Sequence, residues 1–298
     1  MNVPIRRIGI VAKPGLTEAA DLLSAIGAWL TARGVAPCYE VATAALAAGE
    51  LPGSTCEAHA LGSDVQMILV LGGDGTLLGT AGRLAAGQHD VPVLAVNFGS
   101  LGFLTEVRDT EIYDALERAL DGHTQEERRL MLEATVRRAD GTTTHHLALN
   151  DVVITKGALS RMIDLAAYAD GLLIAHFKAD GLIVASPTGS TAYNLSAGGP
   201  IVHPGVDAVL LTPIAPHTLT NRPVVLPASA SLEIRAVSQD GHEVREETYV
   251  SFDGQRGDIL GPGDGVAVHR ASYVLRLLKP VARGYFEVLR KKLRWAER

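Results

Sequence analysis

The segment Gly72-Gly73-Asp74-Gly75-Thr76 is the part of the sequence whose residue types point most directly to chemistry. It follows an apolar run at residues 66–71 (QMILVL), which indicates a buried strand, and it leads into a helix expected over residues 76–86. Glycine lets the backbone approach a ligand closely, and the N–H groups at a helix start favour an anion. The sequence therefore predicts a phosphate loop formed by Gly72, Gly73, Gly75 and Thr76. It is not a Walker loop, because it contains no Gly-Lys-Ser/Thr sequence.

Asp74 is the unusual member of this loop. A carboxylate repels phosphates unless it binds a metal ion or accepts the proton of an attacking hydroxyl. The loop therefore favours transfer of a phosphoryl group to an alcohol. A second interpretation is a tight turn in which Asp74 caps the helix, since turns and helix caps use the same residue types.

Three later segments also combine polar side chains with small residues. Residues 97–104 (NFGSLGFL) follow another strand, so they form either a plain glycine loop or a loop at the same sheet edge as Asp74. The pair Asn150-Asp151 offers a donor and acceptors that suit a ribose diol, or it forms a solvated bend. Residues 186–200 (SPTGSTAYNLSAGGP) gather hydroxyls around Tyr193 and suit a phosphate or a base. They contain no Gly-x-Ser-x-Gly elbow, which disfavours a serine hydrolase.

The elements that must position these residues change character along the chain. Strands expected at residues 7–12, 35–41, 66–71 and 91–96 alternate with helices at 17–32, 76–86 and 109–120. Such alternation implies a parallel sheet with helices on its faces. After about residue 125 the chain is strand-like, with hairpin signals at Asp140-Gly141 and Asp170-Gly171.

We therefore expect an α/β plus all-β protein: a Rossmann-like parallel α/β domain at residues 1–125 and a β-rich domain at 126–277. Residues 278–298 are expected to form a helix that packs back on the fold through Phe286, Leu289 and Leu293.

Composition narrows the class of partner. The 298 residues carry a net charge of −6, which argues against general binding of nucleic acid. Cys38 and Cys56 form neither a CxxC pair nor a disulfide framework. No apolar run approaches the length of about 20 residues that a membrane helix needs, and no signal peptide is recognised. The expectation is a cytoplasmic protein with no membrane or nucleic-acid partner.

The polar segments occur together and in this order in the bacterial NAD kinases, which the chain closely resembles. GGDGT alone is shared with lipid kinases and phosphofructokinases, whereas the long stretch DGLIVASPTGSTAYNLSAGGPIVHP is specific. The resemblance implies that ATP phosphorylates the 2′-hydroxyl of the adenosine ribose of NAD to give NADP. It also implies a divalent metal ion, expected to be Mg²⁺, whose ligands the resemblance does not name. It further implies a homodimer or homotetramer, and NAD bound between the two domains.

Carried over residue by residue, the resemblance makes Asp74 the proton acceptor, with Gly75 against the ligand. It implies that NAD is bound by these residues together with Asn150, Asp151, Arg161, Lys178, Asp180, Thr191, Ala192, Tyr193, Asn194, Leu195, Ser196 and Gln255. Lys178 stands where some relatives carry arginine and some NADH-accepting members carry glycine, so the choice between NAD and NADH stays open.

Two other functions remain possible on the residues alone. A lipid or sugar kinase could share the GGDGT loop, although the polar stretch around Tyr193 argues against an apolar acceptor groove. A nucleotide-sensing protein without turnover would bind NAD and form no product. The phosphoryl donor, ATP or polyphosphate, is also open.

Overall fold

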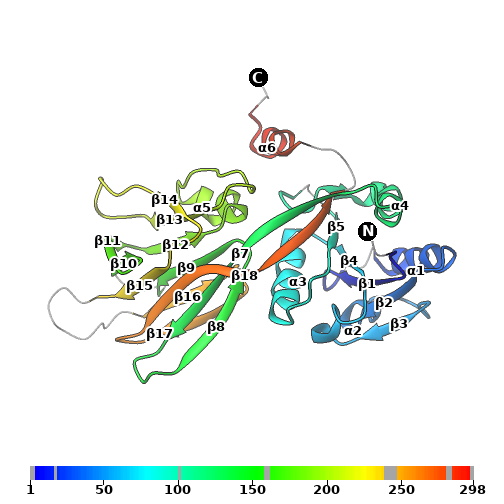
Figure 1. The fold of residues 1–298 in the computed structure, drawn as a ribbon, viewed down its shortest axis with the longest axis horizontal. Helices are drawn as coiled ribbons and strands as arrows, with labels where there is room; N and C mark the ends of the chain where they lie inside the picture. The colour runs from blue at the N-terminus through cyan, green and yellow to red at the C-terminus, as the bar shows by residue number, and fades with distance from the viewer. Residues whose placement is uncertain are drawn as a thin grey trace. The chain divides into compact units, whose positions relative to one another are not determined.

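The computed structural model of the chain describes residues 4–16, 19–99, 102–157, 162–237, 247–279 and 284–295. The chain divides into two compact units (Figure 1), Met1–Arg128 with Leu275–Arg298, and Arg129–Val274. Two long strands, β7 (Gln125–Arg137) and β18 (Gly265–Lys279), run from one unit into the other.

A parallel sheet with strand order β3-β2-β1-β4-β5 is the frame of the first unit. Its strands are β1 (Arg7–Ala12), β2 (Ala36–Glu40), β3 (Ser54–Cys56), β4 (Met67–Leu71) and β5 (Val93–Asn97), and β6 (Val107–Arg108) pairs with β5. The helices are α1 (Ala19–Thr31), α2 (Val41–Ala44), α3 (Asp74–Ala86), α4 (Ile112–Leu120) and α6 (Tyr285–Leu293). Every residue of β4 is buried, as in a parallel strand that is covered on both faces. The α/β expectation for this part of the chain is confirmed.

The register of this sheet places the loops that matter on one edge. Ala12, the last residue of β1, pairs with Leu71, the last residue of β4, and Leu71 pairs with Val96 near the end of β5. Because parallel strands share their direction, the segments that follow β4 and β5 leave the sheet at the same edge.

Helix α6 buries Leu289, as the sequence predicts, and leaves Leu293 half-buried, but Phe286 does not belong to its buried face. Val288 and Leu289 are buried, while the Phe286 side chain is 63% exposed. Successive helix residues are about 100° apart, so a face centred between Val288 and Leu289 turns Phe286 away from it. The Lys292 ammonium lies 5.8 Å from the ring centre of Phe103.

The second unit is β-rich, as expected, and contains two groups of strands. One sheet has the order β14-β13-β12-β9-β16-β17, with antiparallel pairing throughout. Its strands are β9 (Asp151–Lys156), β12 (Gly181–Ala185), β13 (Ala208–Ile214), β14 (Val224–Pro227), β16 (Thr248–Phe252) and β17 (Arg256–Leu260). The other strands are β8 (Thr143–Ala148), β10 (Ile163–Ala169), β11 (Leu172–Ala179) and β15 (Leu232–Ala236), which join β7 and β18.

One hydrophobic core joins the two groups of strands. It contains Val152 and Val184 from the first sheet together with Leu132, Leu165 and Val268 from the other strands, all at most 1% exposed. Alternate residues of each strand face this core, which is the packing of a β-sandwich. The core fixes the ends of β9, β12 and β16, from which the candidate site residues of this unit project.

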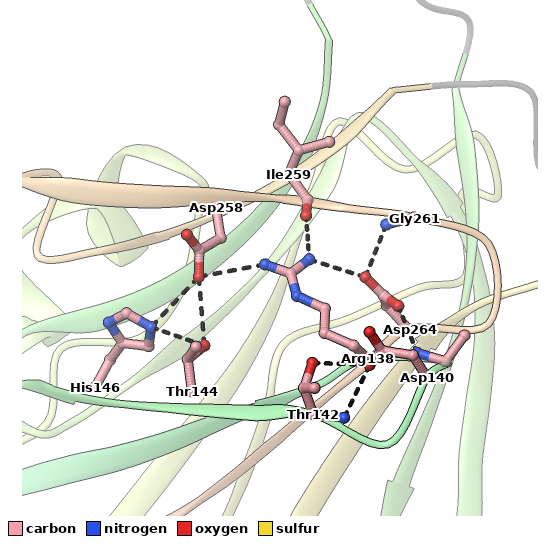
Figure 2. Close-up of polar contacts among 10 residues, drawn as sticks. Arg138, Asp140, Thr142, Thr144, His146, Asp258, Ile259, Gly261 and Asp264 are labelled. Atoms are coloured by element: carbon pink, nitrogen blue, oxygen red, sulfur yellow. Dashed lines mark hydrogen bonds and ion pairs between the residues drawn. The ribbon is translucent and has the colours of Figure 1, made fainter.

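Arg138, at the turn between β7 and β8, binds the hairpin of β16 and β17 through strand β17 (Figure 2). The Arg138 guanidinium donates to Asp264 at 2.8 Å and to the carbonyl of Ile259, and it lies 3.5 Å from Asp258. Burial by itself raises the pKa of Asp264, but hydrogen bonds from Arg138, Gly261 and Ala139 outweigh it and hold that pKa below its usual value. On β8, the His146 ring stacks on Phe252 with centres 4.0 Å apart.

Candidate active site

The glycine loop of the first unit places Asp74 at the first position of α3. Gly72 donates its N–H to the carbonyl of Val96, and Gly73 is the residue that caps the helix. The Asp74 carboxylate does not cap α3 but turns to the segment 103–105, so the interpretation of Asp74 as a helix cap is wrong.

The Asp74 carboxylate collects four hydrogen bonds from that segment. Oδ1 accepts from the backbone N–H groups of Leu104 (3.2 Å) and Thr105 (3.0 Å) and from the Thr105 hydroxyl (2.8 Å). Oδ2 accepts from the N–H of Phe103 at 2.9 Å. The Asn97 amide donates to the Thr105 hydroxyl at 2.8 Å and so extends the network back to β5. The prediction that the Asp74 loop and residues 97–104 share one edge is confirmed.

Gly102 makes this close approach possible. A Cβ atom on Gly102 would overlap the Asp74 carboxylate and the Thr105 hydroxyl. The residue therefore has to be glycine for reasons of space, because the carboxylate occupies the position of its missing side chain.

The glycines of the phosphate loop differ in what they require. A Cβ atom on Gly72 would overlap the Thr76 side chain, so packing within the loop demands glycine there. Gly73 and Gly75 have no positive φ, and a Cβ atom on either would meet nothing within 4 Å among the described residues. Neither their conformation nor packing against the described residues therefore explains these two glycines.

In the second unit, Leu149 and Asn150 form the short connection between β8 and β9, and Asp151 is the first residue of β9. The Asp253 carboxylate, from the turn between β16 and β17, accepts the backbone N–H groups of Leu149 (2.8 Å), Asn150 (2.7 Å) and Asp151 (3.1 Å). On the other side the Asn150 carbonyl accepts the N–H of Ser186 at 2.8 Å. The main chain of the pair is thereby fixed from two strands.

The environment of Asp151 disfavours its charge. The side chain is 5% exposed. Burial in the first place, and the nearby Asp253 carboxylate in the second, raise the pKa of Asp151 to about 7. Burial also raises the pKa of Asp253, although its three backbone hydrogen bonds oppose that shift. Two carboxyl groups thus share a poorly solvated corner.

The stretch from Thr188 to Ser196 forms a short 3-10 helix, Thr188–Thr191, followed by α5, Tyr193–Ser196. Asn194 is fully buried, and its amide is used internally: it donates to the carbonyls of Ser190 and Pro200 and accepts from the Thr212 hydroxyl. The Tyr193 ring is 43% exposed. Within α5, therefore, Tyr193 offers a side chain outward, whereas Asn194 holds the turn together.

The remaining candidate residues lie at several places in the second unit. Lys178, near the end of β11, is exposed. Asp180 lies 3.1 Å from the Lys156 ammonium at the end of β9. Gln255 is exposed in the same turn as Asp253. Arg161 lies outside the described residues.

Three residues that form the site environment were not candidates from the sequence: Asp253, Lys156 and Thr105. Asp253 precedes Gly254 in a hairpin turn, and that signal was available, but it is the same signal as Asp170-Gly171. No local pattern singles out Lys156 or Thr105, whose roles depend on partners 24 and 31 residues away in the chain, Asp180 and Asp74.

Within the described part of the chain, no group of three or more His, Cys, Asp or Glu side chains could hold a metal ion. None of the described helices is long and apolar enough to cross a membrane.

Comparison with known families matches both units. The model of the ATP-NAD kinase N-terminal domain matches residues 8–124, and that of the ATP-NAD kinase C-terminal domain matches residues 149–279. The chain is 46% identical over 294 residues to the NAD kinase of Geobacter sulfurreducens and 44% identical to that of Citrifermentans bemidjiense. In both comparisons 99% of this chain and 100% of the relative are covered.

Solved structures give the same answer for the fold. The yeast NADH kinase complexed with NADH matches with a TM-score of 0.90 and 25% identity, over 99% of this chain and 89% of the yeast chain. An NAD kinase from Archaeoglobus fulgidus in complex with ATP matches with a TM-score of 0.72 and 25% identity, over 97% of this chain and 98% of the other. With both domain models and relatives above 40% identity along nearly its whole length, the chain belongs to the ATP-NAD kinase family.

Proposed function

We propose that this chain transfers the γ-phosphoryl group of ATP to the 2′-hydroxyl of the adenosine ribose of NAD, giving NADP and ADP, with Asp74 accepting the hydroxyl proton. The family supports NAD phosphorylation as the activity. A lipid or sugar kinase and a sensor without turnover do not fit this family and are set aside.

The observation that carries the proposal is the pair of glycines on either side of Asp74. Among the described residues, nothing occupies the space where a Cβ atom of Gly73 or Gly75 would be, and neither glycine has a positive φ. A ligand that approaches the main chain accounts for both. The N–H groups at the start of the 13-residue helix α3 favour an anion at that position, which suits a phosphate.

The geometry around Asp74 suggests which oxygen reacts. Among the described residues Oδ1 accepts three hydrogen bonds and Oδ2 accepts one. Oδ2 therefore has more capacity left than Oδ1 to accept a hydrogen bond from the ribose hydroxyl. The proton passes from the 2′-hydroxyl to Oδ2 as the oxygen bonds to the γ-phosphorus and the bond to the β-phosphate oxygen breaks.

The other candidate residues supply binding and charge balance. Asn150 and Asp151 hold ribose and adenine of NAD, assisted by Arg161, Lys178, Asp180 and Gln255. The α5 region contributes Thr191, Ala192, Tyr193, Asn194, Leu195 and Ser196. In this proposal the Tyr193 ring stacks on the nucleotide. Asn194, whose amide is used internally, contacts the nucleotide through its main chain. Mg²⁺ bound to the triphosphate would neutralise charge on the phosphoryl oxygens.

The test is a coupled assay for NADP combined with glycine substitutions. Gly75→Ala should leave the fold intact or stabilise it by about 0.5–1 kcal/mol, because alanine favours a helix, and should lower kcat/KM at least about tenfold by obstructing the ligand. Gly82→Ala is the matched control, since Gly82 lies in α3 with equally open surroundings.

Equal activity of the two variants would contradict the assignment of the loop to the ligand. The same assay, run with NAD or NADH and with ATP or polyphosphate, defines the acceptor and the donor.

We also propose that the enzyme works in the cytoplasm, where both nucleotide substrates are found, and that it self-associates as a homodimer or homotetramer. Sedimentation of the purified chain at several concentrations measures the second point. A single species with the mass of one chain, 31.4 kDa, at all concentrations would contradict it.

A further inference from the structure

The Asp253 side chain holds the segment Leu149–Asp151, which lies about a hundred residues earlier in the chain. Its carboxylate receives three consecutive backbone N–H groups, those of Leu149, Asn150 and Asp151, at 2.7 to 3.1 Å. Its own N–H donates to the carbonyl of Asp151 at 3.0 Å. Four hydrogen bonds thus tie one side chain and its backbone to three residues about a hundred positions earlier in the chain.

The hairpin that carries Asp253 is shaped for this task. Asp253 and Gly254 have φ of 52° and 64°, the left-handed pair of a type I′ turn, which aspartate and glycine accept more readily than other residues. Just before the turn, Phe252 is held by the stacked ring of His146. Further along the same hairpin, Arg138 binds Asp258 (Figure 2). The carboxylate is therefore presented from a rigid support.

The same three residues are held from the opposite side. The Ser186 hydroxyl donates to the Leu149 carbonyl, and the Ser186 N–H donates to the Asn150 carbonyl. A Cβ atom on Gly189 would overlap the Asn150 backbone, so that loop also packs directly on the segment. With the main chain of Leu149–Asp151 occupied in this way, the side chains of Asn150 and Asp151 have one orientation of the backbone from which to project.

We propose that Asp253 is a positioning residue for NAD: without touching the substrate, its carboxylate fixes the backbone from which Asn150 and Asp151 bind the adenosine half. This inference rests on the proposed function for what Asn150 and Asp151 bind. Hydrogen bonds to an ionised acceptor are stronger than neutral ones, so the loss of this carboxylate has a large effect on the segment.

The charge of Asp253 has a second effect on the same segment. Burial in the first place, and the Asp253 charge in the second, raise the pKa of Asp151 to about 7, so that near neutral pH the Asp151 carboxyl group can donate a hydrogen bond as well as accept one. Asp253 thereby influences both the position of Asp151 and the form in which it meets the nucleotide.

Asp170 provides a control for the turn itself within the same unit. It also precedes a glycine in a type I′ hairpin turn, with φ of 49° followed by 80° at Gly171. Its N–H donates to the carbonyl of Ser231, and its carboxylate accepts the Ser231 N–H at 3.0 Å. Both aspartates have left-handed backbone angles and a backbone N–H that donates to a facing carbonyl. Asp170 differs in being exposed, in accepting one hydrogen bond where Asp253 accepts three, and in holding no candidate site residue.

The experiment compares Asp253→Asn and Asp170→Asn by steady-state kinetics with NAD and ATP varied in turn, and by thermal melting. In Asp253→Asn the amide NH₂ would face the Leu149 N–H, so at least one bond is lost. We expect the KM for NAD to rise at least about tenfold, with the KM for ATP and kcat within about threefold of the parent. Asp170→Asn should leave all three kinetic constants within about twofold of the parent.

Asp253→Gly and Asp170→Gly form a second pair, because glycine adopts the left-handed angles without strain and the hairpin turn survives. The inference is overturned if the Asp253 variants keep the parental KM for NAD, or if they change kcat and both KM values equally. It is also overturned if the Asp253 variants do not fold whereas the Asp170 variants fold. A parent enzyme that makes no NADP would instead overturn the proposed function, and calorimetric NAD affinities of the same variants would then decide the inference alone.

Discussion

Two carboxylates of this enzyme each gather three consecutive backbone N–H groups, one in each unit. Asp74 receives those of residues 103–105, and Asp253 receives those of residues 149–151. In the first unit the carboxylate that accepts these hydrogen bonds is itself the proposed proton acceptor, and the backbone donors orient it. In the second unit the segment that donates the hydrogen bonds carries the proposed ligand residues, and the carboxylate orients that segment. The same arrangement of a carboxylate and three backbone N–H groups therefore orients a reactive group in the first unit and a binding segment in the second.

The surroundings of the two carboxylates fit this division. Asp74 has an additional donor, the Thr105 hydroxyl, and one oxygen that accepts a single hydrogen bond from the described residues. Asp253 lies beside a second carboxyl group, Asp151, and the pKa of each is raised above its usual value, mainly by burial. The arrangement around Asp74 suits a carboxylate oxygen that accepts a proton. The arrangement around Asp253 suits a rigid segment that positions a ligand.

The largest expected effect comes from Asp74→Asn. It removes the proton acceptor and also places an amide NH₂ against donors of residues 103–105, so kcat should fall by about 10²–10⁴-fold. Stopped-time NADP assays measure kcat, and calorimetry measures NAD affinity, which should stay within about threefold of the parent.

Thr105→Val separates the two causes in that variant. It removes the hydroxyl donor to Asp74 but keeps the backbone donors and the shape, so it should lower kcat by about tenfold or less. A near-parental kcat in Asp74→Asn would exclude proton transfer to Asp74. Equal losses in both variants would show that loop order, and not the base, limits turnover.

A smaller but still large effect is expected for Gly102→Ala. The added methyl group would occupy the space of the Asp74 carboxylate, forcing carboxylate and loop apart, with a loss of about 1–3 kcal/mol in stability and at least tenfold in kcat. Urea unfolding and the NADP assay measure the two effects. Parental values of both would mean that the loop adapts without moving Asp74.

The smallest effect is a dependence of stability on pH in the second unit. The pKa of Asp151 is about 7 in the folded chain and about 4 when unfolded, so the folded state holds the extra proton between these values. The contribution of Asp151 to the free energy of unfolding is fully present below pH 4 and is lost as the pH rises through 7. Between pH 5 and pH 8 the parent should lose about 2 kcal/mol more than Asp151→Asn in urea unfolding. Parallel curves for the two proteins would contradict the shifted pKa.

Much of the architecture follows from the sequence because long apolar strands have a clear signature. Residues 66–71 were expected as a buried strand, and β4 occupies Met67–Leu71. Strand β12 (Gly181–Ala185), with five buried residues, lies in the part of the chain that is expected to be strand-like. Helix α2 and strand β3 were not expected: they have four and three residues, and β3 is largely exposed, so neither shows a periodic pattern.

The site was predictable only in part, for a different reason. The type of Asp74 and its place among glycines indicate its chemistry, but every residue has a backbone N–H, so the donors at residues 103–105 carry no signature. Asp253 and Asp170 look alike in sequence, and only the fold decides which of them faces Asn150. Asn194 shows the opposite case. The family resemblance assigns this residue to the ligand, but its side-chain amide is hydrogen-bonded to Ser190, Pro200 and Thr212.

The most direct test of the account is one set of steady-state measurements on Asp74→Asn and Asp253→Asn, with NAD varied at saturating ATP. The account predicts that the first variant loses kcat while its KM for NAD stays near the parental value, and that the second raises the KM for NAD while its kcat stays near the parental value. If both variants change the same constant in the same proportion, the division between a reactive carboxylate and a positioning carboxylate is wrong.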